Sequence, residues 1–406
     1  MLRVSPVFKT WAVGLGILLV VSCGGATTPS SSEHYKIGQI ASLTGAYQAL
    51  GSNDRLGAQQ AFDEINKSGG INGHQVDLLV EDDQTKPDQS VVAFNKLIGE
   101  GVIGMIGSSF TNAELATVPL AQKAKIPYVS TAATDHDILE GGKPGGAIIP
   151  NVFQTVPQVS VVGERLMQYM QAQGLSRMAV AHDTQNAFAD AGTAAQKQIA
   201  AKYGITFVQD VTFESSTTDF TAQLTQVKNS PAQGLMVWAT GPPATIITKQ
   251  AKQLGLKIPL LFSHAQASTL YTKAVGPDGE GVIIASSAAV IGPSLPDSYP
   301  NKKLISAMAA TFQQANGYYP PEFAFNAYAA AKVLAEAIRK ANSTDSNKIV
   351  AQLSNLTLAT AGGEFHFSDT NHWGLNLDWV AIDTDTGGNL VPTDFSKKQL
   401  EQVKSP

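Results

Sequence analysis

The residues best placed to do chemistry form a run of small polar side chains, Gly107-Ser108-Ser109-Phe110-Thr111-Asn112. The run falls between the end of a predicted strand and the start of a predicted helix. Backbone N–H groups at a helix start have no helical partner and lie at the positive end of the helix dipole, so they suit a carboxylate or another anion. Ser108 is a candidate ligand contact, and the hydroxyls of Ser109 and Thr111 could add hydrogen bonds. The alternative is that these residues only cap the helix.

The chain shows no catalytic, metal-binding or nucleotide-binding motif. Glu81-Asp82-Asp83 could suggest an acid–base pair, but adjacent strand residues point to opposite faces, so at most two of the three converge. A second group lacks a recognisable metal-ligand spacing: Glu364, His366, Asp369 and His372. No G-x-S-x-G elbow, G-x-G-x-x-G loop or P-loop is present. We therefore expect no enzymatic activity, no metal and no cofactor.

The elements that must position these residues alternate between strand and helix. The first series has predicted strands at 35–41, 75–81, 102–106 and 128–130, and helices at 53–67, 88–99 and 113–124. A second series has strands at 177–182, 206–211, 234–238 and 260–262, and helices at 187–203, 220–228 and 244–254. This rhythm predicts an α/β fold of two doubly wound, parallel-sheet lobes. Open parallel sheets bind ligands beyond the carboxyl ends of their strands, so two facing lobes would form a cleft there.

The only cysteine of the 406 residues, Cys23, follows an N-terminal run typical of a secretion signal. Arg3 and Lys9 precede about 11 apolar residues, too few to span a bilayer comfortably. Cys23 after Val-Val-Ser resembles a bacterial lipobox, which predicts a signal peptide at 1–22, lipid attachment at Cys23 and a flexible tether over 23–34. The protein would then be extracytoplasmic and anchored to the cell membrane by lipid. The alternative is an ordinary signal peptide cut elsewhere.

Composition excludes other partners. The formal net charge is −5, charged residues make up 15 % of the chain, and no basic run occurs, so we expect no nucleic-acid partner. No second apolar run approaches membrane length. Without a second cysteine, an exported chain holds its fold by packing rather than by disulfides.

Several segments together resemble a known family. They are Leu43-Thr44-Gly45-Ala46, Gly69-Gly70-Ile71-Asn72-Gly73, Glu81-Asp82-Asp83-Gln84, Ile106-Gly107-Ser108-Ser109, residues 126–134 and Ala324-Phe325-Asn326-Ala327-Tyr328. In order and spacing they resemble the type I periplasmic substrate-binding proteins of ABC importers, in the leucine/isoleucine/valine-binding branch. The resemblance covers nearly all of residues 35–390.

The resemblance implies a discontinuous domain organisation with a three-stranded hinge. Lobe 1 would comprise 35–153 and 288–362, lobe 2 would comprise 154–287 and 363–397, and 398–406 would be a C-terminal tail. A small-molecule solute would bind between the lobes, and the closed form would dock on an ABC permease with its ATPase. The alternative function is an extracellular ligand sensor of the same fold, which signals through a partner. An exported hydrolase has little support, because no nucleophile–base pair is visible.

The resemblance also implies further site residues. Ala132 and Thr134 lie in the segment that contacts the ligand's α-carboxylate and α-amino groups in the family, or else form a tight loop. Tyr47 is a candidate lid, although by counting the family's aromatic falls on Leu50. Phe188 stands near the position where the family usually holds a tyrosine. Trp238, which ends a lobe 2 strand, would be an apolar wall of the cleft or part of the core.

The sharpest departure from the family is His264, which aligns with an acidic residue that neutralises a ligand ammonium group. A neutral imidazole accepts one hydrogen bond but does not balance a full positive charge in a poorly hydrated cleft. Either Asp135 or Asp183 takes over, or the ligand lacks a free α-ammonium. In the second case a carboxylate, amide, urea-like compound or aromatic acid would fit better than leucine.

Overall fold

The computed structural model describes residues 34–143 and 145–403. Its first sheet has five parallel strands in the order β2-β1-β3-β4-β5. The strands are β1 Tyr35–Ala41, β2 Val76–Asp82, β3 Gly104–Ile106, β4 Tyr128–Ser130 and β5 Val152–Gln154. The intervening helices are α1 Gln48–Lys67, α2 Pro87–Gly99, α3 Thr111–Ala124 and the short α4 His136–Leu139. Each crossover returns the chain to the same edge, so the loops that follow the strands gather there.

The second sheet has seven strands in the order β14-β13-β10-β9-β8-β6-β7. Five are parallel: β6 Arg177–Asp183, β7 Thr206–Phe213, β8 Gly234–Trp238, β9 Leu260–Phe262 and β10 Ile283–Ser287. β13 Val380–Thr386 and β14 Asn389–Pro392 extend the sheet in antiparallel fashion. Its helices are α5 Val159–Ala172, α6 Ala187–Ile199, α7 Thr221–Lys228, α8 Pro242–Gln253, α9 Thr269–Val275 and α13 Asp394–Leu400. Short 3₁₀ helices lie at η1 Ala200–Tyr203, η2 His264–Gln266, η3 Gly276–Gly279, η4 Ala288–Ser294 and η5 Leu377–Trp379.

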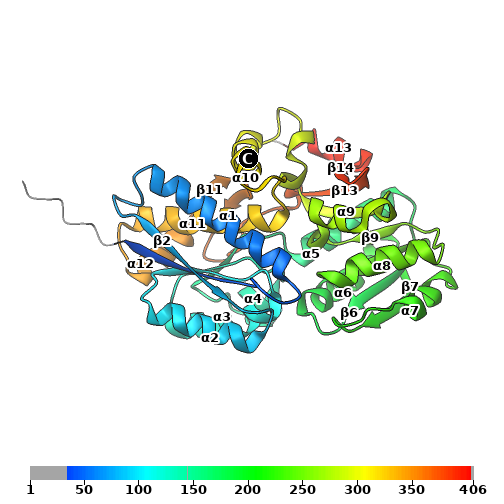
Figure 1. Cartoon of the computed structure of the whole chain (residues 1–406), viewed down its shortest axis with the longest axis horizontal. Helices are drawn as coiled ribbons and strands as arrows, with labels where there is room; N and C mark the ends of the chain where they lie inside the picture. The colour runs from blue at the N-terminus through cyan, green and yellow to red at the C-terminus, as the bar shows by residue number, and fades with distance from the viewer. Residues whose placement is uncertain (1–33, 144, 404–406) are drawn as a thin grey trace, which may run out of the picture. The chain divides into compact units, whose positions relative to one another are not determined.

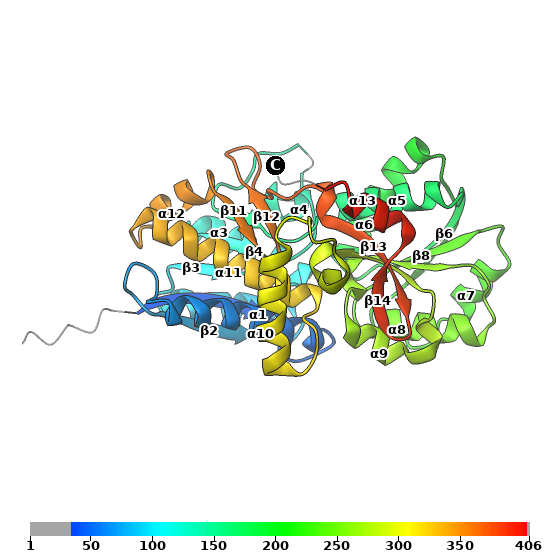
Figure 2. The same ribbon diagram turned by 90° about the horizontal axis from the view of Figure 1, so that it is seen from above.

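The chain returns to the first sheet after η4. The returning elements are α10 Lys302–Asn316, α11 Glu322–Ala341, α12 Ser346–Leu353 and the hairpin of β11 Thr357–Thr360 with β12 Gly363–His366. Figures 1 and 2 both show α11 beside α1. Glycine permits this close approach, because a Cβ on Gly57 would lie 2.1 Å from the Ala324 carbonyl oxygen. The largely alanine-lined inner face of α11 is buried in the same contact.

The predicted α/β fold of two lobes with mostly parallel sheets is confirmed. The second sheet differs in its antiparallel strands β13 and β14, which were not predicted, and the predicted elements differ mainly at their ends. α1 begins at Gln48 rather than at 53, since its first turn carries no apolar periodicity and is held by packing. A Cβ on Gly51 in that turn would lie 2.3 Å from the Ser42 carbonyl oxygen. The predicted helix over 187–203 ends as an α-helix at Ile199 and continues as η1. The lobe boundaries given above remain a prediction.

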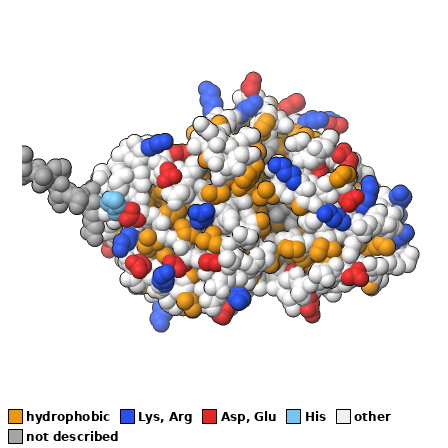
Figure 3. Space-filling model, in the orientation of Figure 1, with side chains coloured by type: hydrophobic (Ala, Val, Ile, Leu, Met, Phe, Trp, Pro, Cys, Tyr) orange, Lys and Arg blue, Asp and Glu red, His pale blue; other side chains and the backbone are white. Residues whose placement is uncertain are grey.

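The surface agrees with a chain that has no concentrated basic patch. On the face drawn in Figure 3, basic and acidic side chains are interspersed and none forms a large region of one sign. Among the helices that the structure describes, none has the length and apolar character needed to cross a membrane. The predicted signal peptide and Cys23 lie outside the described residues, as does the tether up to residue 33.

Candidate ligand-binding site

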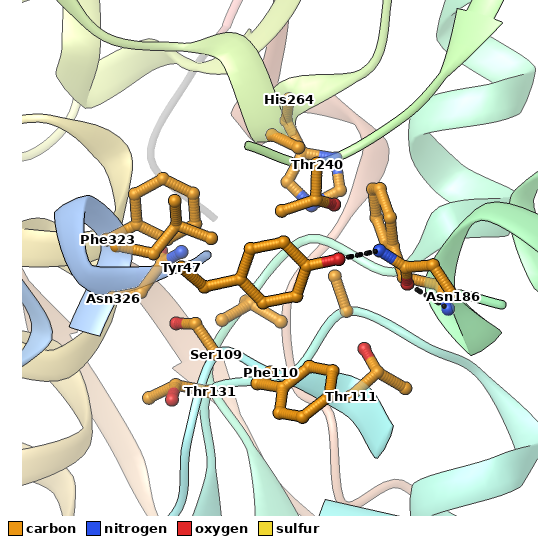
Figure 4. Close-up of a pocket in the computed structure, with 15 residues that line it drawn as sticks. Tyr47, Ser109, Phe110, Thr111, Thr131, Asn186, Thr240, His264, Phe323 and Asn326 are labelled. Carbon is orange, nitrogen blue, oxygen red and sulfur yellow. Dashed lines mark hydrogen bonds between the residues drawn. The ribbon is translucent and has the colours of Figure 1, made fainter. Parts of the chain in front are cut away.

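Loops from both lobes enclose one cavity at the carboxyl ends of the parallel strands (Figure 4). Lobe 1 contributes the loop after β1, the start of α3, the loop after β4 and the start of α11. Lobe 2 contributes the segments that follow β5, β6, β8 and β9. The lining residues are Tyr47, Leu50, Ser109, Phe110, Thr111, Thr131, Ala133, Val156, Asn186, Phe188, Thr240, His264, Ala265, Phe323 and Asn326.

The Tyr47 side chain occupies the middle of this cavity. Figure 4 shows its ring between His264 and Thr240 on one side and Ser109 and Phe110 on the other. Its hydroxyl accepts a hydrogen bond from Asn186 Nδ2 at 2.9 Å, across the two lobes. Burial, followed by the nearby Asp183 carboxylate, raises the pKa of Tyr47 to about 12, so the phenol is neutral. The remaining cavity volume is about 30 Å³, room for a single water molecule.

A second contact joins the lobes beside Tyr47. Asn112, in the first turn of α3, donates from Nδ2 to the Gln185 carbonyl oxygen at 3.0 Å. Its Oδ1 accepts from the Ala187 backbone N–H at 3.0 Å. This paired contact and the Tyr47–Asn186 bond hold the cleft closed.

The lobe 1 wall is organised by buried carboxylates behind it. Asp54 is fully buried in α1 and accepts from Ser109 Oγ at 2.8 Å and from the Ser109 backbone N–H at 3.3 Å. Burial raises the pKa of Asp54 to about 8, and the two Ser109 bonds oppose that rise. The bond to Asp54 therefore fixes the position of the Ser109 hydroxyl at the cavity wall.

Two further carboxylates, those of Asp83 and Glu114, hold polar groups of lobe 1 in the same way. Ser108 Oγ donates to Asp83 Oδ2 at 2.7 Å. The Glu114 carboxylate accepts from the Ser130 hydroxyl and from the Thr131 backbone N–H. Burial raises the pKa of Glu114 to about 8. Thr131 Oγ1 donates to the Gly107 carbonyl oxygen at 3.0 Å, so the hydroxyl of this lining residue is also held by a bond within lobe 1.

The lobe 2 wall has fewer internal bonds. His264 opens η2 and is 4 % exposed, and its ring meets Phe188 edge-on with centroids 5.4 Å apart. Its Nδ1 has no hydrogen-bond partner among the described residues. Burial lowers the pKa of His264 to about 3, so the imidazole is neutral and offers one donor and one acceptor. On the lobe 1 side of the cavity, Asn326 Oδ1 of α11 is a second buried atom of a lining residue with no partner in the described part of the chain.

No charged side chain lines the cavity within the described ranges. Asp183 Oδ1 accepts from the Gln185 backbone N–H at 2.9 Å and Oδ2 accepts from Ser215 Oγ at 2.5 Å. Asp135 lines a separate groove between α4 and α5. Asp183 and Asp135, the two candidates to replace the family's acidic residue, therefore do not line the cavity. Over residues 34–143 and 145–403, no group of three His, Cys, Asp or Glu side chains could hold a metal ion.

The structure brings some of the predicted site residues together and leaves others behind the wall. Tyr47, Ser109, Thr111, Phe188 and His264 line the cavity. Four others are buried and do not line it: Ser108, Ala132, Thr134 and Trp238. Ala132 and Thr134 have their carbonyl oxygens bonded to Gln154 Nε2, while Ala133 and Thr131 beside them face the cavity.

Trp238 lies in the core of lobe 2 behind Phe188. Its Nε1 donates to Gln196 Oε1 at 2.8 Å, and its ring meets Phe188 with centroids 5.3 Å apart. A Cβ on Gly192 would lie 2.3 Å from the indole, so α6 packs directly on this ring. Of the two roles left open for Trp238, the structure favours core packing.

Lining residues that the sequence reasoning did not single out are Phe110, Val156, Asn186, Thr240, Ala265, Phe323 and Asn326. Asn186 carries a usable signal, because an asparagine before a helix is a common cap, and its Oδ1 does accept from Phe188 N–H at 3.0 Å. That bond leaves Nδ2 free to reach Tyr47. Asn326 also gives a signal as a lone amide in an alanine-rich, buried helix face.

Two α/β lobes that close on one uncharged cavity at their strand ends define a bilobal ligand-binding protein. The sequence profile of a family described as "Periplasmic binding protein" matches residues 34–387. The chain belongs to this periplasmic binding protein family, and the resemblance to type I periplasmic binding proteins of the branched-chain amino acid family is confirmed. This family consists of solute-binding proteins rather than enzymes, and membership implies an extracytoplasmic location.

Individual relatives agree. The chain is 28 % identical over 340 residues to "Leu/Ile/Val-binding protein homolog 3" of Brucella melitensis, which covers 82 % of this chain and 87 % of the relative. It is 25 % identical to the "leucine-, isoleucine-, valine-, threonine-, and alanine-binding protein" of Pseudomonas aeruginosa, over 90 % and 92 % of the two chains. Its fold matches the crystal structure of a type 1 periplasmic binding protein from Bordetella pertussis with a TM-score of 0.80 at 24 % identity. That match covers 89 % of this chain and all of the other.

Proposed function

We propose that this protein captures a small solute between its two lobes and delivers it to the permease of an ABC importer. The observation that carries the proposal is the cavity at the strand ends, which residues of both lobes line and which is closed by hydrogen bonds that cross between the lobes. A ligand that contacts both lobes stabilises the closed form, which a permease can distinguish from the open one. Membership of a solute-binding family supports this reading. The lobes are 35–153 with 288–362, and 154–287 with 363–397.

The proposed ligand is a branched-chain amino acid or, preferably, a related amide or carboxylate. The names of the two relatives support the branched-chain skeleton. The uncharged lining and the neutral His264 favour a head group without a free ammonium, since a buried cation without a counter-charge is costly. An amide fits especially well, because its N–H₂ suits Asn326 Oδ1 and its carbonyl suits a hydroxyl or backbone donor near Thr111.

Binding requires Tyr47 to move. The free volume of about 30 Å³ is too small for a branched aliphatic chain. The Tyr47 ring occupies the middle of the space between the two walls. When the lobes separate, the bond to Asn186 breaks and the ring is free to leave the middle of the cleft. On closure over a ligand it would cover the bound molecule from the lobe 1 side. Tyr47 is thus the lid of the proposed site on the lobe 1 side.

A thermal-shift screen tests the proposal with leucine, isoleucine, valine, 4-methylpentanoate and 4-methylpentanamide. A ligand that binds only the folded protein raises its Tm by mass action. We expect a saturable Tm rise with the amide or carboxylate that exceeds the rise with leucine. Thr111→Val should reduce the rise because it removes a lining hydroxyl, whereas Thr311→Val on the exposed face of α10 should not. No rise with any of the five compounds would contradict the proposed ligand class.

We also propose that the mature protein is a lipoprotein attached through Cys23. The support is the basic, apolar and lipobox-like order of the first 23 residues. Cys23→Ser should release the protein from the membrane fraction of cells that express the full chain, while the purified variant keeps its ligand affinity. Membrane retention of the variant would contradict lipid attachment at this residue.

A further inference from the structure

A second and larger pocket adjoins the cleft site and is open to solvent along Ala49, Pro242 and Ala274, which are exposed. Its volume is about 250 Å³, and it lies between the first turns of α1, the start of α8, the segment from η2 through α9, and the start of α11. It shares Leu50, Ala265 and Phe323 with the cleft site, so these side chains form the partition between the two cavities. This second cavity is called the side compartment below.

The side compartment is apolar and uncharged. Among the described residues that line it, the side chains are mainly small or apolar, and none is ionisable at neutral pH. Tyr271 is its only lining residue with an acidic hydroxyl, and that group is paired with Thr248 at 2.7 Å inside the lobe 2 core. Such a lining favours a hydrocarbon or aromatic group over a polar one.

Both lobes build the side compartment. Ala49 and Leu50 come from α1 of lobe 1, and Leu270 and Ala274 come from α9 of lobe 2. Because the walls belong to different lobes, the compartment takes this shape when the cleft is closed. A group that fills it contacts both lobes and therefore stabilises closure in the same sense as a ligand in the cleft site.

One buried polar atom belongs to a residue of the compartment lining. Gln266 is 2 % exposed, and its Nε2 donates to the Ala239 carbonyl oxygen at 3.0 Å. Its Oε1 has no hydrogen-bond partner in the described part of the chain. A buried acceptor without a partner costs stability.

We propose that the side compartment is the second half of the ligand site, so that the natural ligand carries an apolar extension of about the size of an aromatic ring. This inference rests on the proposed function and deepens it. The polar head of the ligand would lie in the cleft site among Ser109, Asn326 and His264. The extension would pass the Leu50–Phe323 partition into the compartment. The ligand class is therefore an aryl- or alkyl-extended amide or carboxylate, larger than leucine.

Two substitutions fill the compartment without touching the cleft site. Ala49→Leu on α1 and Ala274→Leu on α9 each add a side chain from a different lobe, at exposed helical positions where leucine is well tolerated. Neither residue lines the cleft cavity. Ala310→Leu is the matched control, since this exposed alanine of α10 lines neither cavity.

Calorimetric titration of the folded chain with two matched pairs tests the inference. The pairs are 4-methylpentanamide with 4-phenylbutanamide, and 4-methylpentanoate with 4-phenylbutanoate. Whichever pair binds, amide or carboxylate, its phenyl member should bind at least tenfold more tightly than its branched member, because the phenyl ring is buried in the compartment. Ala49→Leu and Ala274→Leu should each weaken the phenyl member at least tenfold and leave the branched member within twofold, and Ala310→Leu should change neither.

Two results would overturn the inference while the proposed function stands. One is a wild-type protein that binds the branched member and gains nothing from the phenyl extension. The other is a phenyl affinity that is unchanged in both Ala49→Leu and Ala274→Leu. If the wild-type protein binds none of the four probes, the proposed ligand class fails and takes the inference with it.

Discussion

The two walls of the cleft are built in opposite ways. On lobe 1, lining hydroxyls are tied to groups behind them: Ser109 to Asp54, and Thr131 to the Gly107 carbonyl oxygen. On lobe 2, His264 lines the cavity with Nδ1 unpaired among the described residues, and Phe188 meets it through ring contacts only. Lobe 1 therefore holds these two hydroxyls in fixed directions before a ligand arrives, whereas the lobe 2 imidazole keeps a nitrogen for the ligand to satisfy, as Asn326 Oδ1 on lobe 1 also does.

This difference assigns separate tasks to the walls. A preorganised wall lowers the cost of binding any head group that matches it. A buried, neutral wall with an unpaired nitrogen discriminates against ligands that do not match it. A ligand that leaves His264 unpaired, or places a charge beside it, binds less tightly. We infer that lobe 1 sets the orientation of the ligand head and lobe 2 sets its charge. The predictions below test that division.

Asp54→Ala should have the largest effect. It leaves the Ser109 N–H and hydroxyl without their acceptor, so we expect a loss of about 3 kcal/mol in the free energy of unfolding and at least tenfold weaker ligand binding. His264→Ala, its counterpart on lobe 2, breaks no side-chain hydrogen bond within the described residues, so only the void that it leaves should count, at about 2 kcal/mol. Denaturant titration measures both. Equal losses would remove the distinction between the walls.

Trp238→Phe should rank next. The substitution removes the hydrogen bond to Gln196 and leaves a void against Gly192, which we expect to cost about 2 kcal/mol of unfolding free energy. Ligand affinity should stay within twofold, because Phe188 separates the indole from the cavity. A large loss of ligand affinity in a variant that remains folded would show that Trp238 takes part in binding.

Substitutions of Asp54 and His264 should change the pH dependence of the unfolding free energy in opposite directions. The pKa of Asp54 rises from an ordinary 3.8 to about 8 on folding, so the native state binds the extra proton and this group destabilises the fold progressively as pH rises through that window. Asp54→Asn should therefore gain stability relative to wild type from pH 4 to pH 8. Denaturant titration at each pH gives the difference.

His264 should show the reverse sign. Its pKa falls from 6.5 to about 3 on folding, so the unfolded state binds the extra proton and the wild type loses stability as pH falls below 6.5. His264→Gln should gain stability relative to wild type between pH 6.5 and pH 4. Parallel profiles for the Asp54 and His264 variants would show that the two groups do not differ as the geometry indicates.

Asn112→Ala should have the smallest effect, limited to the balance between open and closed forms. It removes two cross-lobe bonds at a half-buried position, so we expect a shift of about 1 kcal/mol toward the open form. In stopped-flow experiments this corresponds to roughly fivefold faster ligand release, with the unfolding free energy unchanged. An unchanged release rate would show that this contact does not contribute to closure.

Much of the framework follows from the sequence. Alternating apolar runs predicted two parallel sheets, and β1, β4, β8 and β9 have the predicted bounds because short buried strands between turn residues leave little choice of register. The strand-end rule placed Ser109 and Thr111 in the site. The same rule also suggested Ser108, but its side chain points inward to Asp83. The sequence does not determine which side chains of a loop face the cavity and which face the core.

The remaining features depend on contacts between distant segments. Asn326 and Phe323 reach the cavity only because α11 returns from lobe 2 to pack on α1. Counting within the family could not choose between Tyr47 and Leu50, and the structure shows both at the cavity, with Tyr47 inside it. The side compartment has no sequence signature, since its lining comes from separate helix ends that meet only when the lobes close.

The most direct test of the account is a paired calorimetric titration of wild type and His264→Asp with leucine and 4-methylpentanamide. The central claim is that a neutral lobe 2 wall excludes a free ammonium. Wild type should prefer the amide over leucine by at least tenfold, and His264→Asp should reverse that preference by supplying the missing negative charge. Wild-type protein that binds leucine as tightly as the amide, with no change of preference in His264→Asp, would contradict the claim.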